Sequence, residues 1–281
     1  MQVISEIDLL KELVAAQKDA GKLVGFVPTM GALHAGHLSL VAEASKRCDF
    51  VVVSIFVNPT QFNDPKDLEK YPRTLDADVK LLETTACNLV FAPSVETMYP
   101  EPDTRVFDFG SLATVMEGKF RPGHFNGVGQ VVSRLFDLVQ PHKAFFGQKD
   151  FQQFAIIKHM TNQLGLSVEV VSCPIVREVS GLAMSSRNML LSGQERIEAT
   201  AIHRTLTWAK SECKNRRIEE LKKEISRQIN AVDCLEVEYV EIADAATLQS
   251  VNDWNDAQSI VLCVAVYCGK VRLIDNVLLK G

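Results

Sequence analysis

The segment FVVVSIFVN (50–58) is a β-rich run in which apolar residues follow one another without polar alternation. A strand that faces water on one side alternates apolar and polar residues, so this run predicts a strand buried on both faces, as in parallel sheets. Similar short runs occupy 23–29, 89–93 and 143–147, with helical patterns between them. The alternation predicts right-handed β–α–β units and a doubly wound α/β sheet, which binds ligands at the carboxyl ends of its strands.

Helical spacing of apolar residues marks the segments between these strands. The N-terminal stretch 1–22 reads as an amphipathic helix, and in the helix predicted after the first strand we expect Leu38, Val41, Ala42 and Ala44 to face the core. The remaining helices of this part are predicted at 36–47, 75–86, 127–139 and 150–165.

The pattern of predicted helices and strands changes after about residue 176. A long, highly charged helical region, 192–229, is followed by three β-rich runs at 236–244, 259–269 and 270–279, the last two joined by a turn at Gly269. Helices followed by antiparallel strands indicate a smaller α+β domain. We therefore expect two domains, 1–176 and 177–281.

Charge and composition exclude several classes of protein. A net charge of −5 argues against broad nucleic-acid binding. The longest apolar runs are too short to cross a bilayer, and the N-terminus is acidic where a secretory signal would be basic. Seven scattered cysteines without a CxxC pair fit reduced thiols in a cytoplasm better than a zinc site or a disulfide framework.

Two of the six histidines, His34 and His37, follow the first predicted strand at a spacing of three residues. There, at the first turn of a helix, unpartnered backbone N–H groups and the helix dipole favour a phosphate group. Gly31 and Gly36 allow the backbone to approach a bulky ligand closely. A zinc pair is more often spaced four apart with an acidic base, so phosphate binding is the preferred interpretation and core packing the alternative.

Polar residues also follow the buried strand at 50–58. Asn58 and Gln61 offer uncharged donors and acceptors, which suit a small substrate with hydroxyl and carboxylate groups. The Asn58–Pro59 pair is equally typical of a simple turn.

The same architecture recurs after the strand at 143–147. Lys149 provides a compact positive charge for a phosphate, whereas Asp150 either caps the following helix or contacts a ribose. Gln153 returns to the same helix face.

The segment GLAMSSRN (181–188) places two hydroxyl groups beside a guanidinium group. A phosphate group can be bound by Ser185, Ser186 and Arg187 together, and the arginine can form two parallel hydrogen bonds to it. A serine-rich solvated loop is the alternative interpretation.

These motifs occur in an order that resembles a known family. HAGH (34–37) is similar to the HxGH signature of the nucleotidyltransferase superfamily, and the wider PTMGALHAGHLSLV resembles the ATP loop of the pantoate–β-alanine ligase (pantothenate synthetase) family. VSIFVNPTQF, FFGQKDFQQF and EGKFRPGHFNGVGQVV resemble the next segments of that family, and GLAMSSRN looks like its mobile KMSKS-like loop. The resemblance extends from about residue 3 to RLIDN near the C-terminus.

The resemblance implies a Rossmann-like ATP- and pantoate-binding domain followed by a C-terminal lid domain. It implies ATP-dependent condensation of pantoate with β-alanine through a pantoyl adenylate, with release of AMP and pyrophosphate, as in pantothenate and coenzyme A biosynthesis. His37 and His34 would be the catalytic residues. Gln61 and Gln153 would bind pantoate, with Gln61 near the β-alanine site, and Arg121, His124 and Asn126 would line or support that pocket. The residues implied in ATP binding are Met30, Gly31, Ala32, Leu33, His34, Ala35, Gly36, His37, Gly147, Gln148, Lys149, Asp150, Val176, Met184, Ser185, Ser186 and Arg187.

The family resemblance further implies Mg²⁺ bound to the ATP phosphates and a homodimer in the cytoplasm, without nucleic-acid or membrane partners. No protein metal ligand is assigned, because the acidic run containing Asp76 and Asp78 is sparser than is usual in the family. Three other functions stay open at this stage. They are adenylation of a different small acid or phosphate ester, nucleotide sensing without turnover, and RNA charging, although no basic surface or anticodon-type domain is evident.

Overall fold

The computed structural model describes residues 1–62 and 65–281. The chain forms two compact units. The first contains Met1–Phe109, Gly118–Gln148 and Gln153–Pro174, and the second contains Gly110–Glu117, Lys149–Gln152 and Ile175–Gly281. The expected domains, 1–176 and 177–281, differ from these units mainly in two short segments, and their functional division stays a prediction.

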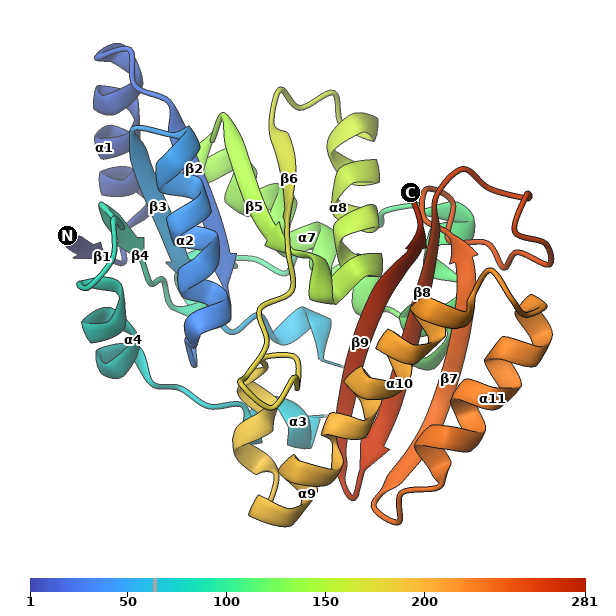
Figure 1. Ribbon diagram of the computed structural model, residues 1–281. Helices are drawn as coiled ribbons and strands as arrows, with labels where there is room; N and C mark the ends of the chain where they lie inside the picture. The colour runs from blue at the N-terminus through green and yellow to red at the C-terminus, as the bar shows by residue number, and fades with distance from the viewer. Residues whose placement is uncertain (63–64) are drawn as a thin grey trace. The chain divides into compact units, whose positions relative to one another are not determined.

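The first unit alternates strands with helices along the chain (Figure 1). Its strands are β1 (Gln2–Ile4), β2 (Val24–Thr29), β3 (Phe50–Ile55), β4 (Leu89–Phe91), β5 (Lys143–Gly147) and β6 (Glu169–Cys173). Its helices are α1 (Ile7–Asp19), α2 (Ala35–Arg47), α3 (Pro65–Lys70), α4 (Leu75–Leu82), α5 (Val95–Met98), α7 (His124–Val139) and α8 (Phe151–Gln163), while α6 (Met116–Phe120) and α8 each include residues assigned to both units.

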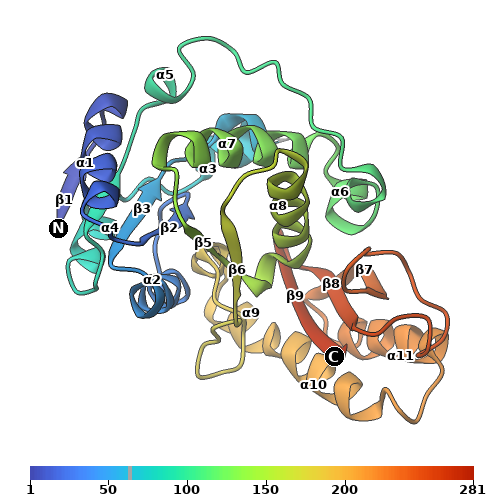
Figure 2. The ribbon, with the colours of Figure 1, turned by 90° about the horizontal axis from the view of Figure 1, so that it is seen from above.

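The six strands form one parallel sheet in the order β1-β4-β3-β2-β5-β6. Helix α2 covers one face, and α1 and α7 cover the other (Figure 2). Helices on both faces bury the central strands from both sides, which explains why β3 is apolar without alternation. The predicted doubly wound α/β fold is confirmed.

Several local predictions need correction. The N-terminal stretch begins with the short strand β1 before α1, and the strand β6 is absent from the sequence-based prediction. On α2 the buried residues are Leu40, Val41 and Ala44, and Leu38 packs partly buried against the same core as predicted, whereas Ala42 is exposed. Alanine is only weakly apolar. Its exposure therefore depends on where it lies relative to the leucine and valine residues that face the core.

The second unit packs helices on an antiparallel sheet. Its helices are α9 (Gly193–Glu198), α10 (Thr200–Glu212) and α11 (Ile218–Asn230), and its strands are β7 (Leu235–Asp244), β8 (Ile260–Cys268) and β9 (Val271–Lys280). The sheet has the order β7-β8-β9, and α11 contributes Ile218, Leu221, Ile225 and Ile229 to the core beneath it. Gly269 turns the chain between β8 and β9 with φ of 57°, a conformation that glycine adopts without strain. The predicted α+β character is confirmed.

Short 3₁₀ turns connect several elements at Pro59–Gln61, Gly110–Ala113, Gln148–Asp150 and Ser186–Leu190. No helix in the described part of the chain is both long and apolar enough to span a bilayer.

Candidate active site

The strand order of the first unit creates one topological switch point. β2 pairs with β3 on one side and with β5 on the other, so the connections from β2 and β5 run in opposite directions along the sheet. Ligands of doubly wound sheets bind at such a point, beyond the carboxyl ends of the strands. His34 and His37 follow β2, and Gly147 and Gln148 lie at the end of β5.

The two histidines lie at the first turn of α2. His34 is the N-cap, and its Nδ1 accepts a hydrogen bond of 3.2 Å from the backbone N–H of Gly36. His37 Nδ1 accepts from the backbone N–H of His34 at 3.3 Å, which completes a reciprocal capping box. The ring centroids are 4.1 Å apart. Because both Nδ1 atoms accept, the neutral form of each ring carries its proton on Nε2, so each ring has an Nε2–H donor.

A buried carboxylate shapes the turn that precedes the histidines. Asp78 accepts hydrogen bonds from the backbone N–H groups of Ala32 at 3.0 Å and Leu33 at 2.7 Å, and is 1% exposed. It also accepts from Thr74 Oγ1 at 3.2 Å. These bonds hold Gly31 and Ala32 at positive φ values of 83° and 49°. Asp78 therefore positions the turn. The sequence alone does not indicate this function, because acidic residues in the first turn of a helix are typical of an exposed surface.

Gln61 lies buried beneath the β2–α2 connection. Its Nε2 donates to Met30 Sδ at 3.0 Å, and its Oε1 accepts from Asn58 Nδ2 at 3.2 Å. Asn58 also caps the turn at Pro59–Gln61 and accepts from the Tyr99 hydroxyl at 3.0 Å. The interpretation of Asn58 as a turn residue is thus confirmed, and the structure brings two predicted site residues, Met30 and Gln61, into contact.

Helix α7 supports Gln61 from behind. His124 is buried and its Nδ1 donates to the Gln61 carbonyl oxygen at 2.8 Å. At Gly127 the helix approaches so closely that a Cβ atom would lie 2.4 Å from the Thr60 carbonyl oxygen. Asn126 is bonded elsewhere: its side-chain oxygen accepts a hydrogen bond of 2.8 Å from the backbone N–H of Phe107. His124 and Gly127 therefore fix the glutamine from its backbone side.

Two adjacent glutamines on α8 differ in environment. Gln152 is buried and bonded to three backbone groups, those of Glu117, Leu112 and Val115. The side chain of Gln153 is partly exposed, and its amide group has no hydrogen bond to a residue that the structure describes. The amide group of Gln152, in contrast, holds backbone groups of the segment 112–117.

The second unit contains the other residues predicted for ATP. Lys149 and Asp150 lie in the turn before α8, with Lys149 Nζ 3.8 Å from Asp150 Oδ1. Asn276 Nδ2 donates to the Lys149 carbonyl oxygen at 2.9 Å and so fixes the backbone of this turn to β9.

Val176 and the serine–arginine motif form one folded loop. The Met184 N–H donates to the Val176 carbonyl oxygen at 3.0 Å, which places these two residues opposite each other. Ser185 caps the 3₁₀ turn Ser186–Leu190 by accepting from Arg187 N at 3.3 Å. Ser186 and Arg187 are half-buried within this turn.

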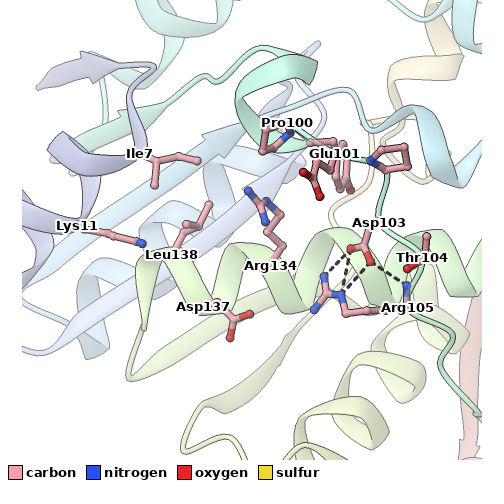
Figure 3. Close-up of a pocket in the computed structure, with 12 residues that line it drawn as sticks. Ile7, Lys11, Pro100, Glu101, Asp103, Thr104, Arg105, Arg134, Asp137 and Leu138 are labelled. Carbon is pink, nitrogen blue, oxygen red and sulfur yellow. Dashed lines mark hydrogen bonds and ion pairs between the residues drawn. The ribbon is translucent and has the colours of Figure 1, made fainter.

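A separate cavity of about 610 Å³ lies in the first unit beside α1 and α7 (Figure 3). The guanidinium group of Arg134 extends from α7 toward Glu101, while Arg105 forms an ion pair with Asp103 at 2.6 Å. None of the residues predicted for ATP or pantoate lines this cavity. It is therefore distinct from the candidate active site.

The carboxylates near the site are occupied in ways that bear on metal binding. Asp78 is committed to backbone N–H groups, as described above, and Asp76 is exposed. Within residues 1–62 and 65–281, no three His, Cys, Asp or Glu side chains are grouped so that they could hold a metal ion.

Comparison with known proteins identifies the family. The pantoate-beta-alanine ligase family model matches residues 2–278. A Porphyromonas gingivalis pantothenate synthetase is 54% identical over 277 residues, covering 99% of each chain. A Bacteroides fragilis pantothenate synthetase is 55% identical over 280 residues, covering 100% of this chain and 99% of the relative.

Solved structures agree with the sequence relatives. A pantothenate synthetase of Thermus thermophilus is 42% identical, with a TM-score of 0.92 and complete coverage of both chains. A Francisella tularensis pantoate-beta-alanine ligase, complexed with beta-gamma ATP and beta-alanine, is 35% identical with a TM-score of 0.82 and covers 99% of this chain and 98% of that one. The chain belongs to the pantoate–β-alanine ligase family.

Proposed function

We propose that this enzyme condenses pantoate with β-alanine at the expense of ATP, in two steps. A pantoate carboxylate oxygen attacks the α-phosphorus of ATP, the bond to the β-phosphate breaks, and pyrophosphate leaves. The β-alanine amine then attacks the acyl carbon of the pantoyl adenylate, and AMP leaves. The observation that carries this proposal is the pair of adjacent histidines at the start of α2, beyond the switch point of the sheet.

His34 and His37 are the catalytic residues in this proposal. Their Nε2–H groups donate to phosphate oxygens as negative charge accumulates on the departing pyrophosphate. Both rings are oriented in advance by backbone hydrogen bonds to Nδ1, so little reorganisation is needed in the transition state. Neither step needs an enzyme nucleophile, and catalysis rests on positioning and charge stabilisation.

The other ATP contacts come from two sets of residues. In the first unit, the turn Met30–Leu33, with Ala35 and Gly36, contacts the nucleotide, as do Gly147 and Gln148. In the second unit, Lys149, Ser185, Ser186 and Arg187 hold the triphosphate by charge-assisted hydrogen bonds, and Asp150, Val176 and Met184 contact the nucleoside.

Gln61 and Gln153 bind pantoate. The buried Gln61 is held by Asn58 and Met30, and its neighbour His124 fixes its backbone. Gln153 supplies an amide group that is not bonded to the described part of the chain. Two oriented amides match the hydroxyl and carboxylate groups of pantoate, and β-alanine binds near Gln61.

The serine–arginine loop belongs to the domain 177–281, for which we propose the role of a lid that closes when the substrates bind. Closure would exclude water, which otherwise hydrolyses the acyl adenylate. Magnesium bound to the ATP phosphates would neutralise part of their charge, and we assign no protein ligand to it. We further propose that the enzyme is a cytoplasmic homodimer.

Exchange of labelled pyrophosphate into ATP tests the adenylate directly. The enzyme should catalyse exchange only when pantoate is present, and β-alanine should not be required. Exchange without pantoate would indicate a different acid substrate, and absence of both exchange and AMP formation would favour a nucleotide-binding protein without turnover.

A further inference from the structure

The loop that contains the serine–arginine motif has a folded base. Residues 176–184 form a small hairpin in which Arg177 and Ala183 pair as an antiparallel bridge and the Glu178 N–H donates to the Leu182 carbonyl oxygen at 2.9 Å. The reversal occurs at Gly181, whose φ of 94° suits glycine. The motif itself, 184–187, follows directly from this hairpin.

One carboxylate connects the hairpin to two later parts of the chain. Glu178 accepts from Arg196 through two hydrogen bonds, Nε to Oε2 at 2.9 Å and Nη2 to Oε1 at 2.8 Å. It also accepts from Asn188 Nδ2 at 2.8 Å. The Glu178 side chain is 15% exposed and that of Arg196 is 50% exposed, so the carboxylate is mostly shielded while the arginine reaches it from the surface.

Asn188 closes the loop around the motif. Its side chain is 3% exposed, and the same Nδ2 that binds Glu178 donates to the Ala183 carbonyl oxygen at 3.0 Å. The Asn188 N–H donates to the Ser185 carbonyl oxygen at 3.0 Å. Ala183 and Asn188, on either side of Met184–Arg187, are therefore joined through one amide group, and Glu178 anchors that amide to α9.

We infer that Glu178 is a positioning residue for ATP, acting through Asn188 on Ser185, Ser186 and Arg187. This inference rests on the proposed function of that motif. The carboxylate holds the ends of the motif at a fixed separation, so its hydroxyl and guanidinium groups need not be ordered when the triphosphate binds. Preorganisation of this kind lowers the entropic cost of binding and increases affinity.

A purely structural role for Glu178 makes a different prediction. Loss of the carboxylate would then lower stability, and the KM values for ATP and pantoate would change together or not at all. A positioning role acts on the ATP side alone, because pantoate is assigned to Gln61 and Gln153 in the first unit.

Glu178→Gln and Glu178→Ala test the inference, with kinetics and urea unfolding measured for each full-length variant. Glutamine keeps the shape and one acceptor but replaces the other oxygen by a donor facing Asn188 or Arg196. We expect the KM for ATP to rise about tenfold in the Gln variant and more in the Ala variant, while the KM for pantoate changes less than about twofold.

Glu224→Ala is the matched control. Glu224 on α11 also accepts two hydrogen bonds from one arginine, Arg227, and a third from an amide, that of Gln228, but it has no link to the loop among the described residues. Its removal should leave both KM values unchanged. If Glu178→Ala fails to fold, Glu178→Gln alone decides. Unchanged or equally raised KM values would overturn the inference, whereas loss of pantoate-dependent exchange in the wild-type enzyme would instead overturn the proposed function.

Discussion

Side chains of one type, close together in the chain, have different functions in this enzyme. Asp76 is exposed on α4, whereas Asp78, two residues later, is buried against the turn before the histidines. Gln152 is buried and bonded to backbone groups, while its neighbour Gln153 is partly exposed, and we propose that it binds pantoate. Residue type therefore does not decide function here; the burial and hydrogen bonding of each position do.

His37→Ala should slow adenylate formation by about 10²–10³-fold, the usual cost of losing one preorganised donor to a developing negative charge. Rapid-quench measurement of the first half-reaction reports this step without interference from product release. His159→Ala is the control, because His159 is an exposed histidine on α8. A rate for His37→Ala within a few-fold of wild type would remove His37 from the mechanism.

Asp78→Asn should lower stability by about 1–3 kcal/mol, because an amide has one acceptor where the carboxylate receives three hydrogen bonds from Ala32, Leu33 and Thr74. It should also raise the KM for ATP, since the turn at Gly31–Leu33 loses its support. Urea unfolding and steady-state kinetics measure both effects. Asp76→Asn should change neither, and comparable effects of the two substitutions would contradict the assignment to Asp78.

The chemical character of single residues is readable from the sequence, but their partners are not. Glycines and a preceding strand predict His34 and His37 at the first turn of a helix, and the structure has them there. The link from Asp78 to Leu33 joins residues 45 positions apart. No local pattern contains such a contact, because it depends on how α4 packs.

At the scale of elements, strands buried on both faces are the easiest to predict. β2, β3 and β5 sit in the middle of the sheet, and burial on both sides imposes unbroken apolar runs. A prediction based on such runs does not find the edge strands β1 and β6. β6 has exposed residues at Glu169 and Ser172, since an edge strand has only one neighbour and tolerates polar residues.

Gly127→Ala tests how tightly α7 packs on the turn that carries Gln61. The added Cβ would lie 2.4 Å from the Thr60 carbonyl oxygen and 2.8 Å from Gln61 Cα, so the helix or the turn must shift. We expect Gly127→Ala to lower the free energy of unfolding by about 1–3 kcal/mol and to raise the KM for pantoate above the wild-type value. Gly193→Ala, where nothing lies within 4 Å of the new Cβ, provides the control for both measurements. Wild-type values for Gly127→Ala would show that this close contact does not govern the pantoate site.

At the scale of the whole molecule, a short segment is fixed by an ion cluster in the second unit. Glu117 receives two hydrogen bonds from Arg272, at 2.8 and 2.7 Å, and one from the Tyr239 hydroxyl at 2.9 Å. Burial, and then the adjacent Glu117 carboxylate, raise the pKa of Tyr239, so its hydroxyl stays protonated and donates. Glu117 and Arg272 are 155 positions apart, and no sequence pattern links them.

Arg272→Met should destabilise the enzyme by about 3 kcal/mol, because it leaves Glu117 and Glu238 as shielded carboxylates without their shared cation. The midpoint of urea unfolding, monitored by circular dichroism, measures the loss. Arg227→Met removes an exposed arginine from a surface pair and should leave the midpoint unchanged. A wild-type midpoint for Arg272→Met would mean that the cluster does not hold the segment 110–117.

In the proposed mechanism, the pantoate carboxylate is activated by its attack on the α-phosphorus of ATP. Pantoate labelled with ¹⁸O in its carboxylate distinguishes this route from any other, and mass spectrometry of the released AMP gives the readout. We expect AMP formed in a complete turnover with β-alanine to contain one oxygen atom derived from pantoate. Unlabelled AMP with the label in pyrophosphate, or ADP with the label in inorganic phosphate, would contradict attack on the α-phosphorus.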